Sequence, residues 1–454
     1  WSAKQCAGML PDPILHHDHD AQHMTTIVLT SNLEILMTIR LSFVPLLLVL
    51  AGCGSTDAPS TVPASASGVA AEPTAIRPFE VHIPDAVLDD LRLRLRRTRY
   101  PDELAGVDWD YGTSLAYQRE LLAYWADEFD WREQERQINA LDHFKTNIDG
   151  LDIHFIHQRS PVEGATPLLV SHGWPGSFLE FMKVVGPLTD PVAHGGNAED
   201  AFHVVIPSIP GFGFSDKPTE PGYGPAQMGD IFAKLMDRLG YERYGAQGGD
   251  WGSAITRRVA GEHPDKVIGL HLNLVSAGPP PGVDDPEEGV PTAELERMRE
   301  RQAFWGPEQG YSAIQGTKPQ TLGYALNDSP AGQAAWIIDK VHVLCDCPGG
   351  HEDKFTKDEI LANITLYWVT ETATSASRIY LESRRTRGGG AGYIEVPTAA
   401  ALFPNEIALP PRKWAEARYN IVRWTEMPRG GHFAALEEPE LYVDDVRAFF
   451  ASLR

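Results

Sequence analysis

A short turn around Asp250 constrains the fold of this chain more than any other stretch of its sequence. The turn, Gly248-Gly249-Asp250-Trp251-Gly252, follows a strand-like run over residues 242–245 and opens a helical run over residues 254–262. Glycines that bracket a reactive residue in this way predict a sharp strand-to-helix turn, which holds the central side chain above the end of a sheet. The glycines let neighbouring backbone segments pass closely. Because the central residue is an aspartate, its carboxylate is a candidate nucleophile.

Apolar runs on both sides of this turn predict a mostly parallel, doubly wound sheet. The predicted strands cover residues 144–148, 151–157, 167–171, 203–207 and 267–272. The first two read as a hairpin, and the alternation of strands with helical stretches predicts an α/β fold. Reactive groups in such a sheet lie beyond the carboxyl ends of its strands. The loop that begins at His172 is therefore expected beside Asp250, and His172 is interpreted as a residue that stabilises this loop.

A helical insertion is expected to cover the site. Residues 276–392 carry mostly helical patterns and include Tyr311 and Tyr380, so this segment is predicted to form a lid. Strands are predicted again over residues 393–397 and 419–426.

Each of these last two strands is followed by an ionisable residue. Glu406 lies in the loop after the first, whereas Glu416 lies in a helical stretch and Glu426 ends a strand. His432 follows the last strand in a glycine-rich loop. The chain order is therefore Asp250, Glu406, His432, which is the order of nucleophile, acid and base expected on this type of sheet.

The charge of the chain argues against a nucleic-acid-binding protein. Its 454 residues include 39 Lys and Arg and 62 Asp and Glu, and the net charge is −23. Because nucleic-acid-binding proteins present a basic surface, no nucleic-acid partner is expected.

The cysteines suggest neither a disulfide framework nor a metal site. There are four, Cys6, Cys53, Cys345 and Cys347, too few for a disulfide-rich scaffold of this length. Cys345-Asp346-Cys347 has the wrong spacing for a zinc knuckle. Cys345 and Cys347 are therefore interpreted as packing or surface residues, and no metal is expected.

The first 75 residues are typical of an export segment. Residues 1–36 contain four closely spaced histidines, which would permit metal binding, but Met37 has the character of a start, so residues 1–36 are interpreted as an upstream extension. Residues 37–53 combine Arg40, a short apolar run and small residues, a pattern that predicts a secretory signal. The run is too short to span a bilayer permanently.

The end of this signal, Leu50-Ala51-Gly52-Cys53, resembles the bacterial lipobox. The resemblance implies Cys53 as a lipidation site, and an ordinary cleaved signal is the alternative. Gly54 in the next position favours the outer membrane, so we expect a bacterial, periplasmic protein anchored through Cys53. Residues 54–75, rich in Ser, Thr, Ala and Pro, are expected to form a flexible linker.

The remaining chain divides into four expected segments. An N-terminal meander with helical apolar spacing covers residues 76–150 and contains no chemical constellation. The first part of the core covers residues 151–275, the lid residues 276–392, and the second part of the core residues 393–454.

Five motifs in this region resemble those of the microsomal-type epoxide hydrolases. They are His172-Gly173-Trp174-Pro175-Gly176-Ser177, Gly248-Gly249-Asp250-Trp251-Gly252-Ser253, Gln315-Gly316-Thr317-Lys318-Pro319-Gln320-Thr321, Asn327-Asp328-Ser329-Pro330 and Arg429-Gly430-Gly431-His432-Phe433-Ala434-Ala435. The resemblance covers residues 76–454 and implies an α/β-hydrolase fold with a helical lid.

The resemblance also implies roles for individual residues. Asp250 is the nucleophile, His432 activates water, and Glu406 is the charge-relay acid. Tyr311 and Tyr380 bind the epoxide oxygen. The expected reaction converts a small apolar epoxide and water to a vicinal diol through an aspartyl ester, without metal or organic cofactor. The oxyanion donors of this fold, the N–H after the nucleophile and one after the third strand, are those of Trp251 and Trp174.

Two alternatives stay open at this point. A haloalkane dehalogenase also uses an aspartate at this turn but needs no tyrosine acid, so Tyr311 and Tyr380 favour an epoxide. A catalytically inactive protein that binds a small apolar ligand is the second alternative. Such a protein would not need a nucleophile, base, acid, oxyanion loop and two tyrosines together. The sequence indicates neither the oligomeric state nor which epoxide is used.

Overall fold

A computed structural model of the chain describes residues 74–386 and 392–454. The predicted signal with Cys53, the upstream extension and nearly all of the predicted linker lie outside the described residues, so they remain predictions. In the part of the chain that is described, no helix is long and apolar enough to cross a membrane.

A nine-stranded sheet forms the centre of the fold, with the strand order β1-β2-β3-β5-β4-β6-β7-β8-β9. The strands are β1 (Arg77–Pro78), β2 (His143–Ile148), β3 (Leu151–Gln158), β4 (Thr166–Ser171), β5 (Phe202–Pro207), β6 (Tyr244–Gly248), β7 (Val267–Leu272), β8 (Ile394–Leu402) and β9 (Tyr419–Glu426). From β5 to β9 all neighbours pair in parallel, and β1, β2 and β3 add an antiparallel edge. The expected mostly parallel sheet of the α/β-hydrolase fold is confirmed.

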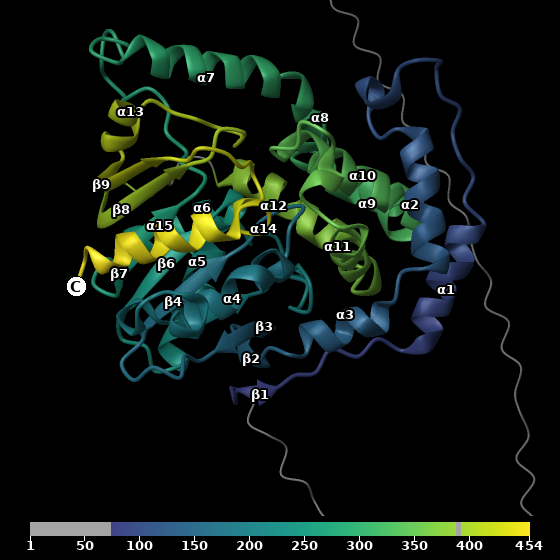
Figure 1. Cartoon of the computed structure of the whole chain (residues 1–454), viewed down its shortest axis with the longest axis horizontal. Helices are drawn as coiled ribbons and strands as arrows, with labels where there is room; N and C mark the ends of the chain where they lie inside the picture. Colours follow the sequence, from purple (N-terminus) through teal and green to yellow (C-terminus); the bar gives the residue numbers. More distant parts are fainter. Residues whose placement is uncertain (1–73, 387–391) are drawn as a thin grey trace, which may run out of the picture. The chain divides into compact units, whose positions relative to one another are not determined.

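Helices cover both faces of this sheet (Figure 1). On one face α5 (Pro225–Arg238) packs with α6 (Asp250–Glu262), and on the other α4 (Met182–Thr189) packs with α15 (Pro439–Ala451). The central strands β4 and β6 are buried along nearly their whole length, as expected for parallel strands covered on both faces.

The lid and the N-terminal meander pack against each other. The meander comprises α1 (Asp85–Arg96), α2 (Leu115–Asp127) and α3 (Trp131–Ile138). The lid comprises α7 (Thr292–Trp305), α8 (Gly310–Gln315), α9 (Pro319–Asp328), α10 (Pro330–Leu344), α11 (Lys357–Val369) and α12 (Ala373–Arg385). The indole N–H of Trp125 in α2 donates to Thr365 Oγ1 in α11 at 2.9 Å. The meander therefore braces the lid, a role that the sequence did not indicate.

Two short helices belong to the C-terminal part of the core. They are α13 (Arg412–Glu416), which lies between β8 and β9, and α14 (Ala434–Glu437), which follows the His432 loop.

The structure differs from the sequence-based expectations in three places. Strand β6 runs to Gly248 and α6 begins at Asp250 itself, so strand and helix meet at the turn. Strand β8 extends to Leu402, past Pro397, because a register shift beside this proline lets the pairing with β9 continue. The interpretation of Cys345 and Cys347 as separate packing residues is wrong, since they form a disulfide with a Cα–Cα distance of 5.3 Å.

Candidate active site

The turn between β6 and α6 holds Asp250 in an unusual backbone conformation. Its φ angle is +46°, which lies in the left-handed region that side chains other than glycine rarely adopt. Such strain is found where the surrounding structure imposes it, often at a functional site. A Cβ atom on Gly252 would lie 2.0 Å from the carbonyl oxygen of Ser171 at the end of β4, so this position requires glycine. The close approach brings the turn against the loop after β4.

That loop presents a backbone donor to the carboxylate. The N–H of Trp174 donates to Asp250 Oδ1 at 2.7 Å. Burial raises the pKa of Asp250, whereas His432 and the N–H groups of Trp174 and Trp251 act to lower it. The two backbone donors thus surround the carboxylate as an oxyanion hole would.

The lid fixes this loop from above. Asn363 in α11 accepts a hydrogen bond from Ser177 Oγ at 2.8 Å and donates to the carbonyl of Pro175 at 2.7 Å. The hydroxyl of Tyr367, one turn further along α11, donates to the carbonyl of Gly176 at 2.7 Å. The position of the Trp174 N–H therefore depends on the lid.

His432 lies between the two carboxylates. Its Nδ1 atom lies 2.6 Å from Glu406 Oε1 and its Nε2 atom 3.5 Å from Asp250 Oδ2. All three side chains are largely or fully buried, with His432 at 4% and Glu406 at 1% exposure. Burial opposes the charged imidazolium, but the charge and hydrogen bond of Glu406 and the charge of Asp250 raise the pKa of His432 to about 9.

The Glu406 loop is held by a contact with the lid. Arg301 in α7 donates from Nε to the carbonyl of Glu406 at 2.8 Å, and from its terminal nitrogen to the carbonyl of Asn405 at 2.7 Å. The carboxylate itself accepts the N–H of Ile407 at 2.5 Å.

Four aromatic rings enclose the space beside Asp250. The ring centroids of Trp174 and Tyr311 lie 5.0 Å apart, those of Trp251 and Tyr380 4.8 Å, and those of the two tyrosines 5.7 Å. Among the described residues, Tyr380 Oη and Trp251 Nε1 are buried without a hydrogen-bond partner. Such groups are costly unless a ligand satisfies them, so the cage offers unused donors toward a bound molecule.

The tyrosine hydroxyls remain protonated in this environment. Burial, together with the negative charge of Asp250, raises the pKa of Tyr311 and Tyr380 well above the ordinary value. Both side chains therefore present an O–H donor at neutral pH, although they come from separate lid helices, α8 and α12.

A further carboxyl group, which no motif in the sequence indicates, lies close to Asp250, Glu406 and His432: that of Glu180. Its carboxylate lies over Gly176, where an added Cβ atom would come within 2.4 Å of Glu180 Oε2, and Glu180 lines a cavity of about 330 Å³ between the loop after β4, α3, α10 and α11. Burial raises the pKa of Glu180 to about 8, partly countered by His432 and supported by Asp250. No spacing in the sequence could have indicated it, because the contact depends on the fold of the loop after β4.

His172 has the structural role expected for it. Its Nε2 atom accepts the N–H of Ile209 at 3.3 Å, while Nδ1 lies 3.1 Å from the carbonyl of Gly173. Burial lowers the pKa of His172 to about 4. The neutral ring joins the loop after β4 to the segment after β5.

No group of three or more His, Cys, Asp and Glu side chains lies close enough to hold a metal ion within residues 74–386 and 392–454. The described site brings together a buried carboxylate, an imidazole that contacts a second carboxylate, two backbone donors and two phenol donors.

Two family models match the chain. The model "Epoxide hydrolase N terminus" matches residues 76–181, and the model "alpha/beta hydrolase fold" matches residues 166–325. Together they cover the meander, the loop after β4, the Asp250 turn and the first part of the lid.

Named relatives and solved structures agree with these models. Epoxide hydrolase 1 of Sus scrofa is 41% identical over 416 residues, which cover 85% of this chain and 90% of that protein. The crystal structure of juvenile hormone epoxide hydrolase from Bombyx mori is similar with a TM-score of 0.77 and 33% identity, and covers 84% of this chain and 95% of that one. The epoxide hydrolase of Aspergillus niger has a TM-score of 0.76 and 32% identity, with 84% and 97% covered.

Proposed function

Because this chain belongs to the epoxide hydrolases of the α/β-hydrolase fold, we propose that it converts an apolar epoxide to a vicinal diol through an ester on Asp250. The observation that carries the proposal is the position of the Asp250 carboxylate. It lies between the N–H of Trp174, the imidazole of His432 and an aromatic cage with an unpaired Tyr380 hydroxyl. A carboxylate nucleophile suits displacement at a saturated carbon, and no carbonyl group is needed in the substrate.

In the first half-reaction an Asp250 oxygen attacks one ring carbon of the epoxide. The carbon–oxygen bond of the ring breaks, and its electron pair stays on the epoxide oxygen, which takes a proton from Tyr311 or Tyr380. The products are an ester of Asp250, which carries a neighbouring hydroxyl group, and a tyrosinate. The four rings around the site favour an apolar substituent on the epoxide.

In the second half-reaction His432 takes a proton from water, and the hydroxide attacks the carbonyl carbon of the ester. The N–H groups of Trp174 and Trp251 stabilise the oxyanion. When the tetrahedral intermediate collapses, the bond between the former ester carbonyl carbon and the product oxygen breaks. The product leaves as an alkoxide, which takes the proton from His432 and becomes the diol. The proton left on the Asp250 carboxyl returns through solvent to the tyrosinate, so the net reaction adds one water to one epoxide.

The charge of Asp250 links the two steps. In the free enzyme, this charge contributes to the raised pKa of His432. The ester is neutral, so its formation removes that contribution and makes His432 a better base when water must be activated. Glu406 supports the imidazolium that forms.

The experiment uses styrene oxide and the full chain. A single turnover in oxygen-18 water should place the label in the Asp250 carboxylate, because hydroxide attacks the ester carbonyl and the diol retains the oxygen of Asp250. Label in the first diol would show direct attack of water and overturn the covalent mechanism. Asp250→Asn should abolish rapid diol formation, and His432→Gln should accumulate an adduct on the Asp250 peptide in mass spectrometry.

A further inference from the structure

The loops that carry the acid and the base are joined to each other next to the site. Asn405 precedes Glu406, and its N–H donates to the carbonyl of Gly430 at 3.1 Å. Asn405 also forms an isolated parallel bridge with Gly431, which precedes His432. The register of this bridge therefore sets how Glu406 and His432 face each other.

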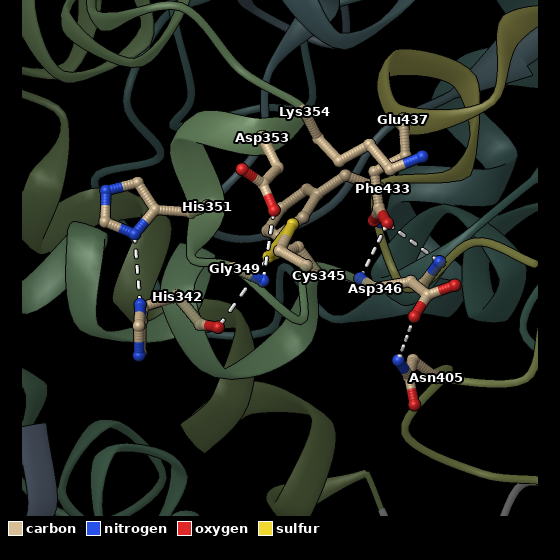
Figure 2. The surroundings of a disulfide bond; sticks show 12 residues. His342, Cys345, Asp346, Gly349, His351, Asp353, Lys354, Asn405, Phe433 and Glu437 are labelled. Carbon is tan, nitrogen blue, oxygen red and sulfur yellow. Dashed lines mark hydrogen bonds between the residues drawn. A yellow bond between two sulfur atoms is a disulfide. The ribbon is translucent and has the colours of Figure 1, made fainter.

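A third segment, residues 344–346 at the end of α10, contacts both loops through Asp346. Asp346 Oδ1 accepts the side-chain amide of Asn405 at 2.7 Å (Figure 2), and Oδ2 accepts the N–H of Gly430 at 2.8 Å. The Asp346 carboxylate thus accepts one hydrogen bond from the loop that carries Glu406 and one from the loop that carries His432. Hydrogen bonds to a charged acceptor are stronger than those between neutral groups.

The backbone around Asp346 strengthens the same junction. The N–H of His432 donates to the carbonyl of Leu344 at 3.1 Å. Glu437 Oε2 accepts both the N–H of Asp346 at 2.8 Å and the N–H of Gly431 at 2.9 Å. A Cβ atom on Gly431 would lie 2.5 Å from the Leu344 carbonyl oxygen, so this close approach requires glycine.

The disulfide between Cys345 and Cys347 closes a small ring around Asp346. Cys345 is 6% exposed, and Figure 2 shows it beside the loop that presents Asp346 to Asn405. A covalent bond across a single residue limits the backbone conformations open to that residue. Disulfides persist in oxidising compartments, which agrees with the export expected from the N-terminal sequence.

We propose that Asp346 is a positioning residue for ester hydrolysis, held in place by the Cys345–Cys347 disulfide, so that reduction of this disulfide slows the hydrolytic half-reaction. The inference rests on the proposed covalent mechanism. An external dithiol would supply the two electrons and two protons: the sulfur–sulfur bond breaks, two thiols form on the protein, and the dithiol becomes a disulfide. Loss of Asp346 contacts then loosens the His432–Glu406 pair, while the attack of Asp250 on the epoxide does not need His432 as a base.

The test measures both half-reactions of the full chain in single turnovers, by the fluorescence of the tryptophans beside Asp250 and by mass spectrometry of the ester. Asp346→Ala should slow hydrolysis on the order of 10- to 100-fold, the effect of a small misplacement of a reacting group, with little change in ester formation. Asp353→Ala is the matched control. Asp353 accepts the N–H of Gly349 in the same loop at 3.0 Å and, within the described residues, makes no hydrogen bond or ion pair with the Asn405 or Gly430 loops. It should leave both rates unchanged.

A purely structural role for Asp346 gives a different result. It would lower the melting temperature and the amount of active enzyme, but it would not change the ratio of the two rates or accumulate ester. Equal loss in both steps, or no change in either, would overturn the inference. If no ester forms even in the unmodified enzyme, the proposed mechanism itself fails, so the two failures are distinguishable.

The disulfide is tested separately. Treatment with dithiothreitol, with reduction of Cys345 and Cys347 verified by mass, should slow hydrolysis in the unmodified chain. The double variant Cys345→Ser, Cys347→Ser should be slow already and insensitive to the reductant, although it keeps Cys6 and Cys53. An unchanged hydrolysis rate in the reduced enzyme would overturn the role of the disulfide.

Discussion

The Nε2 atom of His432 lies 3.5 Å from the Oδ2 atom of Asp250. At this distance the aspartate charge favours the imidazolium, and with Glu406 it raises the pKa of His432 to about 9 in spite of burial. His432 is therefore mostly protonated at neutral pH in the free protein. In the mechanism proposed above, it becomes available as a base once formation of the ester has removed the Asp250 charge.

The first prediction concerns the pH dependence of the two half-reactions. Ester hydrolysis should rise with pH through an apparent pKa below about 9, because the neutral ester no longer supports the imidazolium. Ester formation should fall at acidic pH, as Asp250 becomes protonated at a pKa above its ordinary value. Stopped-flow rates across pH, with NMR titration of His432 in the free enzyme, measure both. Equal pKa values for His432 in the free and esterified states would contradict this account.

The second prediction concerns the acid. Glu406→Gln removes the charge at 2.6 Å from His432 Nδ1, so it should lower the pKa of His432 and slow hydrolysis by about 100-fold or more, a typical contribution of acid–base catalysis. Ester formation should change far less, and ester should therefore accumulate. Glu416→Gln is the control, because Glu416 is exposed and pairs with Arg412 at the surface. Loss of ester formation as the main effect would argue against the assigned role.

The third prediction concerns the lid tyrosines. Tyr380→Phe keeps the ring beside Trp251 but removes the hydroxyl, so ring opening should slow by roughly 10-fold or more while hydrolysis of the ester stays nearly unchanged. The variant with both Tyr311 and Tyr380 changed to Phe should open the ring more slowly still, because neither phenol proton remains. Tyr324→Phe, on an exposed lid tyrosine, should have no effect. Slower ester hydrolysis with an unchanged rate of ester formation would contradict the role of the tyrosines in ring opening.

The fourth prediction concerns the stability cost of Glu180. Its pKa rises from 4.5 in an ordinary environment to about 8 in the fold, mainly because of burial. The folded state therefore binds this proton more tightly than the unfolded state. Protonated Glu180 thus contributes to the free energy of unfolding at low pH, and this contribution is lost as the pH rises from 4.5 to about 8. Glu180→Gln removes the titration, so its melting temperature should fall less than that of the unmodified chain between about pH 5 and pH 8. Parallel curves would show that Glu180 does not titrate in this range.

The parts of the site that sequence could predict are those set by local pattern. The glycines around Asp250 and the order of Asp250, Glu406 and His432 follow from short motifs and strand succession. Resemblance indicated Tyr311 and Tyr380, which the folded lid brings to a ring distance of 5.7 Å. Contacts between distant segments could not be read in this way.

Asp346 shows the limit of sequence reasoning. The Cys345-Asp346-Cys347 spacing was visible, but its partners Asn405 and Gly430 are far along the chain and meet it only because α10 ends beside both loops. The disulfide was missed because the number of cysteines argued against a framework, and that count cannot identify a single local bond. The same limit applies to the strand β8, whose continuation past Pro397 depends on pairing with β9.

The last prediction concerns Cys53, whose lipidation stays a prediction because it lies outside the described residues. If Cys53 is diacylated, the protein expressed in a bacterium with lipoprotein processing should sediment with membranes, because two acyl chains give a stable anchor. Cys53→Ser should release it to the soluble fraction with its epoxide hydrolysis intact. Cys6→Ser is the matched control and should leave the membrane fraction unchanged. If the Cys53 variant still sediments with membranes, the anchor lies elsewhere, whereas a soluble unmodified protein would indicate an ordinary cleaved signal.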